Sequence, residues 1–287
     1  MGEKPRQTDL SEKTVVYRMP GTDAVTVRRD VEYGSSGGDR LTMDVYLPPG
    51  ATDGERTPAV IVVAGYPDPG FAARIGCSFK EMGSSVSWGR LMAASGLAAV
   101  TYTNREPAAD LDALLRYIRE NASSLGIDEA RIGLFAASGN VPLALSVLTE
   151  GGPEHPKCAV LCYGYTLDLE GSTAVADAAR MFGFANPAAG KSADDLPRDV
   201  PLFLVRAGKD EVPRLNEALD RFLAAALARN LPVRLVNHPT APHAFDLFDD
   251  GETSREIIRE TLAFLRFHLL GADEPPRKVP PAGRRSG

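Results

Sequence analysis

The chain has 287 residues, of which 44% are hydrophobic and 24% charged, and this suits a globular protein of one large domain or two small ones. Its formal net charge of −6 argues against a nucleic acid or an anionic membrane as partner. Residues 1–18 lack the apolar core of a secretion signal, and the longest apolar run, 59–65, is too short to span a bilayer. We therefore expect a cytoplasmic protein.

The first elements expected along the chain are the two strands of an antiparallel hairpin. Residues 24–33 and 41–47 alternate apolar with polar side chains, and Ser-Ser-Gly-Gly at 35–38 is typical of the turn between them. The polar residues 1–14 before the hairpin predict a disordered tail. A single domain is expected over 15–271.

Six short, nearly continuous apolar runs follow, and such runs indicate strands buried on both faces. They lie at 59–64, 98–102, 131–135, 159–163, 201–205 and 233–237. Helical patterns separate them, at 87–95, 109–121, 141–149, 214–229 and 254–269. Strands alternating with helices predict an α/β fold with one mostly parallel, eight-stranded sheet flanked by helices.

Two long connections interrupt this alternation, at 67–86 and 166–200. Loops of this length carry function or helices of their own. We expect both to leave the sheet at the carboxyl ends of strands and to shape a pocket there, with 166–200 acting as a short cap. The Pro-, Gly- and Arg-rich stretch at 272–287 predicts a second disordered tail.

The three cysteines are few and odd in number, which fits a reducing compartment. Cys158 and Cys162 are four residues apart in a predicted strand, so their Cα atoms would lie roughly 13 Å apart, too far for a disulfide. We interpret both as small core residues.

The strand at 131–135 runs into the sequence Ala136-Ala137-Ser138-Gly139-Asn140 and then into a helix. A nucleophile elbow needs this arrangement, because small neighbours let strand and helix pack closely around a serine in a strained turn. Asn140 stands where the usual Gly-x-Ser-x-Gly pattern has glycine, and implies a slightly wider helix–strand contact. The alternative is an ordinary N-cap serine.

The partners expected for Ser138 follow later strands, in the order nucleophile, acid, histidine. Asp210 lies just past the strand at 201–205, and His243 lies inside the loop after the last strand. A turn aspartate, or Glu211 as the acid, remains an alternative to the first assignment. His238, at the strand end, remains an alternative to the second.

These residue types suit acyl transfer. Histidine has the pKa to deprotonate a serine at neutral pH, and a buried carboxylate fixes the imidazole tautomer. The oxyanion hole is expected to use the backbone N–H groups of Gly139 and Tyr66. The alternative for Tyr66 is a simple loop without a catalytic role.

With these residues in place, the sequence resembles the α/β-hydrolases, and within them the dienelactone hydrolase-like and acetyl-esterase-like group. The resemblance covers about 25–270 and rests on 41–48, 60–66, the Ser138 elbow and Pro242-His243-Ala244-Phe245. It implies an eight-stranded sheet and acyl transfer without metal or cofactor, with Ser138, Asp210 and His243 as the triad. Dienelactone hydrolases hold cysteine where this chain has serine, which favours a general esterase.

The sequence therefore predicts a serine hydrolase acting on a small or medium carboxylic ester. A peptidase or acyltransferase on the same fold shares the acyl-enzyme and stays an alternative. A non-catalytic binding protein is left open by Ala136 and Asn140 in the elbow. The sequence sets no oligomeric state, so a homodimer also stays open.

Overall fold

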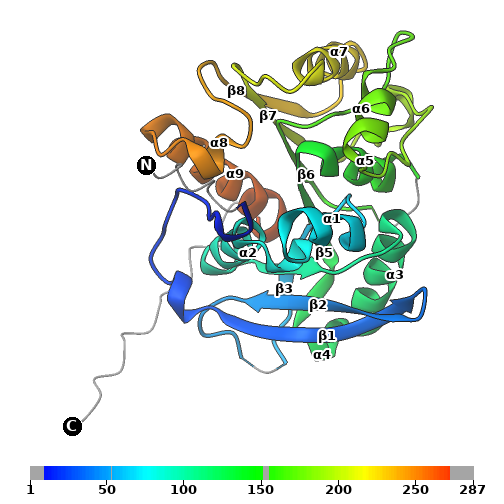
Figure 1. Ribbon diagram of the computed structural model, residues 1–287. Coiled ribbons are helices and arrows are strands. Elements are labelled where there is room, and N and C mark those ends of the chain that lie inside the picture. Colours follow the sequence, from blue (N-terminus) through cyan, green and yellow to red (C-terminus); the bar gives the residue numbers. More distant parts are fainter. Residues whose placement is uncertain (1–9, 53, 151–154, 272–287) are drawn as a thin grey trace, which may run out of the picture.

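The computed structural model describes residues 10–52, 54–150 and 155–271 and contains one sheet of eight strands (Figure 1). The strand order is β1-β2-β4-β3-β5-β6-β7-β8, and β2 runs in the direction opposite to that of the other seven strands. The predicted α/β class and mostly parallel eight-stranded sheet are therefore confirmed. The strands are β1 Thr26–Ser36, β2 Asp39–Leu47, β3 Thr57–Val62, β4 Ala98–Tyr102, β5 Ile127–Ala137, β6 Ala159–Cys162, β7 Leu202–Ala207 and β8 Val233–His238.

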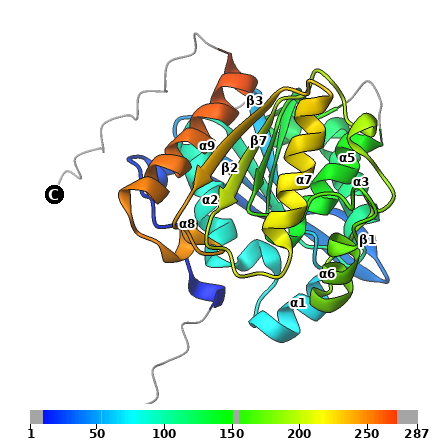
Figure 2. The ribbon, with the colours of Figure 1, turned by 90° about the horizontal axis from the view of Figure 1, so that it is seen from above.

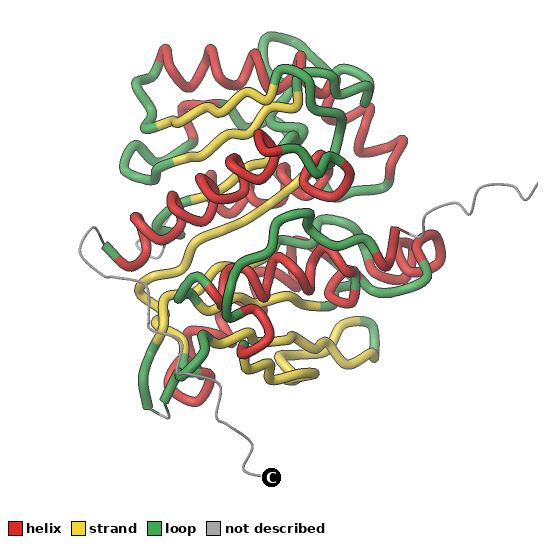
Figure 3. The backbone as a smooth tube through the Cα atoms, turned by 90° about the vertical axis from the view of Figure 1, so that its left-hand side faces the viewer, coloured by secondary structure: helices red, strands yellow, loops and turns green. Residues whose placement is uncertain are grey.

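Helices cover both faces of the sheet (Figure 2). One face packs against α2 (Gly83–Ala94) and α9 (Glu252–Leu270), and the other against α3 (Pro107–Glu120), α5 (Val141–Thr149) and α7 (Leu215–Ala228). Figure 3 shows how strands and helices alternate along the chain. The shorter helices are α1 Asp68–Ile75, α4 Ala122–Leu125, α6 Ala174–Phe182 and α8 Phe245–Phe248. Among the described segments, none of the helices combines the length and apolar character that crossing a bilayer requires.

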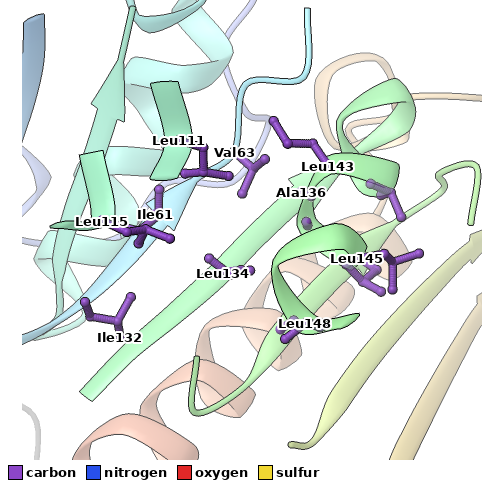
Figure 4. Packing of buried hydrophobic residues seen from close by; sticks show 14 of the residues in the cluster. Ile61, Val63, Leu111, Leu115, Ile132, Leu134, Ala136, Leu143, Leu145 and Leu148 are labelled. Carbon is purple, nitrogen blue, oxygen red and sulfur yellow. The ribbon is translucent and has the colours of Figure 1, made fainter. Parts of the chain in front are cut away.

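The central strand β5 shows why an unbroken apolar run predicts a buried strand. Leu134 and Ala136 point to one face, where leucines of α3 and α5 cover them (Figure 4). Phe135 points to the other face and contacts Trp88 of α2, with ring centroids 4.5 Å apart. Both faces are thus sealed from water, and the end of β5 is held at a fixed place in the sheet.

The hairpin turn is tighter than predicted. Ser35 and Ser36 belong to β1, and the turn consists of Gly37 and Gly38 alone, with φ angles of 57° and 86°. A two-residue hairpin favours positive φ at both central positions, which glycine adopts without strain. The other predicted strands and helices are present. The strand at 98–102 and the helix at 141–149 have the predicted ends, while the ends of the others are shifted; the helix expected at 87–95, for example, begins at Gly83.

The packed chain begins earlier than the predicted boundary at residue 15. Leu10–Glu12 form a 3₁₀ turn, and a Cβ on Gly83 of α2 would lie 2.8 Å from the carbonyl oxygens of Glu12 and Lys13. The N–H of Val15 donates to Ser87 Oγ of α2 over 3.0 Å. The predicted tail at 1–14 therefore includes residues, 10–14, that the structure describes beside α2. Its remainder, 1–9, lies outside the described residues, as does the predicted tail at 272–287.

Candidate active site

Ser138 stands at the turn from β5 into α5. Its φ of 58° lies in the left-handed region, which a residue with a side chain rarely adopts. The close approach that this turn requires is provided by Gly164, just after β6. A Cβ there would lie 2.2 Å from Val141 Cγ2 and 2.7 Å from the Ser138 carbonyl oxygen. The elbow therefore relies on a glycine that follows the neighbouring strand β6, and the local pattern around Ser138 does not reveal it.

Ser138, His243 and Asp210 lie in one hydrogen-bonded chain. Ser138 Oγ is 2.9 Å from His243 Nε2, and His243 Nδ1 is 2.6 Å from Asp210 Oδ2. The Asp210 side chain is fully buried, whereas that of His243 is 27% exposed. The second carboxylate oxygen of Asp210 accepts the N–H of Val212 over 2.9 Å. The structure thus brings the three predicted residues together, with the acid buried and the imidazole partly exposed.

The alternative residues lie elsewhere. Glu211 is exposed and forms no hydrogen bond with His243 among the described residues. His238 is buried at the end of β8, and its Nε2 lies 3.1 Å from Ser254 Oγ of α9. Neither side chain is therefore part of the hydrogen-bonded chain that ends at Ser138.

The two residues expected to form the oxyanion hole are also adjacent. A Cβ added to Gly139 would lie 2.3 Å from the Tyr66 hydroxyl oxygen and 2.7 Å from the Phe184 ring. Tyr66 therefore packs directly on Gly139, and a larger residue at 139 would displace it. Which backbone N–H groups receive an oxyanion stays a prediction.

Asn140, the departure from the usual elbow pattern, has a definite position. Its Oδ1 accepts the N–H of Gly65 over 2.7 Å, and its Nδ2 donates to the Ala137 carbonyl oxygen over 2.9 Å. A Cβ on Gly65 would lie only 3.0 Å from Asn140 Cα. The asparagine thus ties the loop that carries Tyr66 to the elbow that carries Ser138, a connection that the sequence pattern did not indicate.

A cavity of about 260 Å³ opens beside Ser138 and His243. The 67–86 segment contributes to its mostly apolar wall, as predicted. The prediction for 166–200 is wrong for this cavity, because no lining residue comes from that segment; Met181, for instance, is 68% exposed. Phe184 instead packs on Tyr66 from outside. The residues that shape the wall next to the site are Tyr66, Phe71, Ile75, Phe79, Met82, Trp88 and Leu247.

A second buried carboxylate lines the same cavity. Asp246 accepts hydrogen bonds from the Tyr163 hydroxyl at 2.5 Å and from Trp88 Nε1 at 2.9 Å. Burial raises the pKa of the Asp246 carboxyl above its ordinary value, while these two hydrogen bonds oppose the rise. The Tyr163 ring stands edge-on to the His243 imidazole. Sequence reasoning missed Asp246; the available signal was an acidic residue three positions after the histidine.

Comparisons with known proteins support the fold. No protein-family model matches the sequence, and no curated protein matches it. Among solved structures, vibralactone cyclase superposes with a TM-score of 0.69 at 18% identity, over 89% of this chain and 83% of that one. A bacterial heroin esterase superposes with a TM-score of 0.64 at 19% identity, over 86% of each chain. An α/β-hydrolase enzyme from a Medee basin deep-sea metagenome library superposes with a TM-score of 0.61 at 17% identity, over 86% of this chain and 98% of that one.

The chain therefore has the α/β-hydrolase fold. Identities below 20% establish the architecture and leave the activity to be argued from the site. Within the described residues, no cluster of three or more His, Cys, Asp or Glu side chains is arranged to hold a metal ion.

Proposed function

We propose that the chain is a serine hydrolase that cleaves carboxylic esters of small or medium size through an acyl-enzyme. The observation that carries the proposal is the hydrogen-bonded chain from Ser138 Oγ through His243 to the buried Asp210. It starts at a serine held at a positive φ and opens on an apolar cavity. Esterases among the structural neighbours, such as the bacterial heroin esterase, support the choice of an ester bond.

Each group has a defined task in this mechanism. Ser138 Oγ attacks the ester carbonyl carbon while His243 Nε2 takes the serine proton. Asp210 holds the Nδ1 proton and stabilises the imidazolium that forms. The oxyanion accepts hydrogen bonds from the N–H groups of Gly139 and Tyr66. His243 then protonates the leaving alcohol, and a water molecule deprotonated by His243 hydrolyses the acyl-enzyme.

The cavity supports the proposed substrate size. Its volume of about 260 Å³ lies just below the roughly 300–1,000 Å³ of pockets for drug-sized ligands. Each methylene transferred from water to an apolar wall contributes about 0.8 kcal/mol. We therefore expect kcat/KM to rise about tenfold from an acetyl to a butyryl ester, which adds two methylenes. The rise should stop once the cavity is full.

The first experiment compares wild type, Ser138→Ala and Ser123→Ala on p-nitrophenyl acetate, butyrate and octanoate. Ser123 is an exposed serine of α4 that does not line the cavity, and it serves as the control. Loss of a triad nucleophile should lower kcat by about 10⁴-fold or more. Ser123→Ala should keep the kcat of wild type. Equal activity in Ser138→Ala and wild type would show that Ser138 is not the nucleophile.

A fluorophosphonate probe decides the case in which wild type hydrolyses none of these esters. Labelling of Ser138, absent in Ser138→Ala, would show an activated serine and direct the search to peptide bonds or acyl acceptors. No labelling would favour a binding protein that retains the fold and cavity.

A further inference from the structure

Asp246 is a buried carboxylate that the mechanism above does not use. It lies in the first turn of α8, three residues after His243, and is 4% exposed. Its two oxygens are bound by donors from two distant parts of the chain. The Tyr163 hydroxyl donates from the end of β6, and the Trp88 indole N–H donates from α2.

The backbone of Asp246 adds a third connection, because its carbonyl oxygen accepts the N–H of Val16 over 2.8 Å. The histidine loop is thereby joined to the sheet, to α2 and to the N-terminal segment at a single residue. The loop needs such an anchor, since Ala244, beside the histidine, has a φ of 53°. A non-glycine residue keeps that conformation only where its surroundings impose it.

Tyr163 connects this anchor to the imidazole. Its ring stands edge-on to His243, with centroids 5.2 Å apart and planes at 73°, and it packs in the same way against Phe245 at 5.6 Å. Asp246 holds the hydroxyl end of that ring. The imidazole is therefore bounded by the Asp210 carboxylate at Nδ1 and by a tyrosine ring whose far end is fixed.

We propose that Asp246 is a positioning residue: it fixes Tyr163 and the 241–248 loop so that His243 Nε2 stays within hydrogen-bonding distance of Ser138 Oγ. The catalytic consequence rests on the proposed function. Displacing a catalytic group by about 1 Å can slow a reaction by about 10²-fold. The anchor should therefore affect kcat far more than substrate binding.

A series of variants separates the hydrogen bonds from the charge. Asp246→Ala removes both acceptors and should lower kcat about 100-fold, with KM within about threefold. Asp246→Asn keeps the shape and both contacts, because its oxygen can accept from the indole and its amide can donate to the tyrosine oxygen. It should lose less than about tenfold in kcat. Asp250→Ala, at an exposed aspartate two residues after this loop, is the control and should stay within about twofold.

Two further readouts do not depend on activity. Trp88 is the only tryptophan, so its indole N–H gives a single nuclear magnetic resonance signal. Asp246→Ala should shift that signal, speed its exchange with solvent, and raise amide hydrogen exchange in the 241–248 loop. Asp250→Ala should leave all three unchanged. If Asp246→Ala does not fold, Tyr163→Phe, which removes one hydroxyl and keeps the ring, is expected to lower kcat about tenfold and raise loop exchange.

The outcomes keep the two proposals apart. Wild type without hydrolysis or labelling at Ser138 would overturn the hydrolase, while the indole and exchange readouts would still test the anchor. A folded Asp246→Ala or Tyr163→Phe with kcat within about twofold of wild type and unchanged loop exchange would overturn the positioning role. A loss that appears in KM alone would overturn it as well, since it would assign Asp246 to the substrate.

Discussion

Two groups of buried charges in the described part of the chain are built in opposite ways. In the first, beside the hairpin, Lys80 Nζ lies 2.6 Å from Asp30 Oδ1 and 2.8 Å from Asp44 Oδ1. The Lys80 and Asp44 side chains are 6% and 2% exposed. In the second, Asp210 and Asp246 are buried near His243, and neither forms an ion pair with a Lys or Arg side chain of the described residues.

The difference indicates what each group does. A cation buried between two carboxylates leaves little charge for a ligand to meet, and this suits a structural role. In the second group no fixed cation neutralises Asp210, whose carboxylate is hydrogen-bonded to His243 Nδ1. In the proposed mechanism a positive charge appears beside Asp210 only as Ser138 attacks and His243 takes its proton, so Asp210 stabilises the transition state more than the resting enzyme.

The largest effect is expected from Asp210→Asn. The amide preserves the shape but not the charge or the tautomer of His243, so kcat should fall by about 10⁴-fold. The free energy of unfolding in urea should change little. The control is Asp220→Asn, at an exposed carboxylate of the neighbouring helix α7 that pairs with Arg206 of β7. It should keep wild-type kcat.

Full activity in Asp210→Asn would remove the electrostatic contrast between the two groups. The exposed Glu211 would then be the acid to replace, by glutamine, in the same assay.

The next largest effect tests the first group. Lys80→Met keeps the length of the side chain and leaves Asp44 buried without its closest cation. Breaking a buried ion pair in this way should lower the free energy of unfolding by about 3 kcal/mol. This is the lower end of the usual range, because Arg29 remains 3.6 Å from Asp44. The activity of the folded protein should be unchanged, as measured by urea titration and p-nitrophenyl ester turnover.

A double variant and a surface control sharpen this result. Lys80→Met with Asp44→Val removes both buried charges and should recover at least about half of the lost stability. Lys157→Met, at an exposed lysine, should change stability by less than about 0.5 kcal/mol. A loss of kcat in Lys80→Met without loss of stability would show that the hairpin group also serves the site.

Much of the fold could be predicted because its signals are local. A strand buried on both faces, such as β5, is an unbroken apolar run, and β4 was predicted with its observed ends. Ser138, Asp210 and His243 could be proposed together because each follows a strand of one mostly parallel sheet. The carboxyl ends of parallel strands share an edge, and the structure places all three within one hydrogen-bonded chain there. Their catalytic role stays a prediction.

The remaining features depend on contacts between distant residues. Trp88 and Asp246 are 158 positions apart, and nothing near either residue indicates the hydrogen bond between them. Asn140 departs from the usual elbow pattern, and the pattern does not indicate its hydrogen bond to Gly65, 75 positions away. The lining of the cavity was only half predicted, because the length of the 166–200 segment does not show which way it folds.

The smallest effect concerns Asp30, the exposed member of the first group. Its side chain is 61% exposed, so the pair with Lys80 should contribute at most about 1 kcal/mol. Asp30→Asn is a mild change, because asparagine tolerates the φ of 54° found there. Urea unfolding at pH 7 should therefore show a loss well below that of Lys80→Met. Asp23→Asn, at an exposed aspartate nearby, should show none.

The pH dependence of that small difference has a definite sign. The hydrogen bond from Lys80, and then its charge, lower the pKa of the Asp30 carboxyl in the folded chain. The resulting stability is complete above the unfolded pKa of about 3.9 and is lost as the pH falls through the lower folded value. The gap between wild type and Asp30→Asn should thus shrink from pH 7 to pH 3. A gap that widens in acid, or one as large as that of Lys80→Met, would mean that Asp30 belongs with the buried charges.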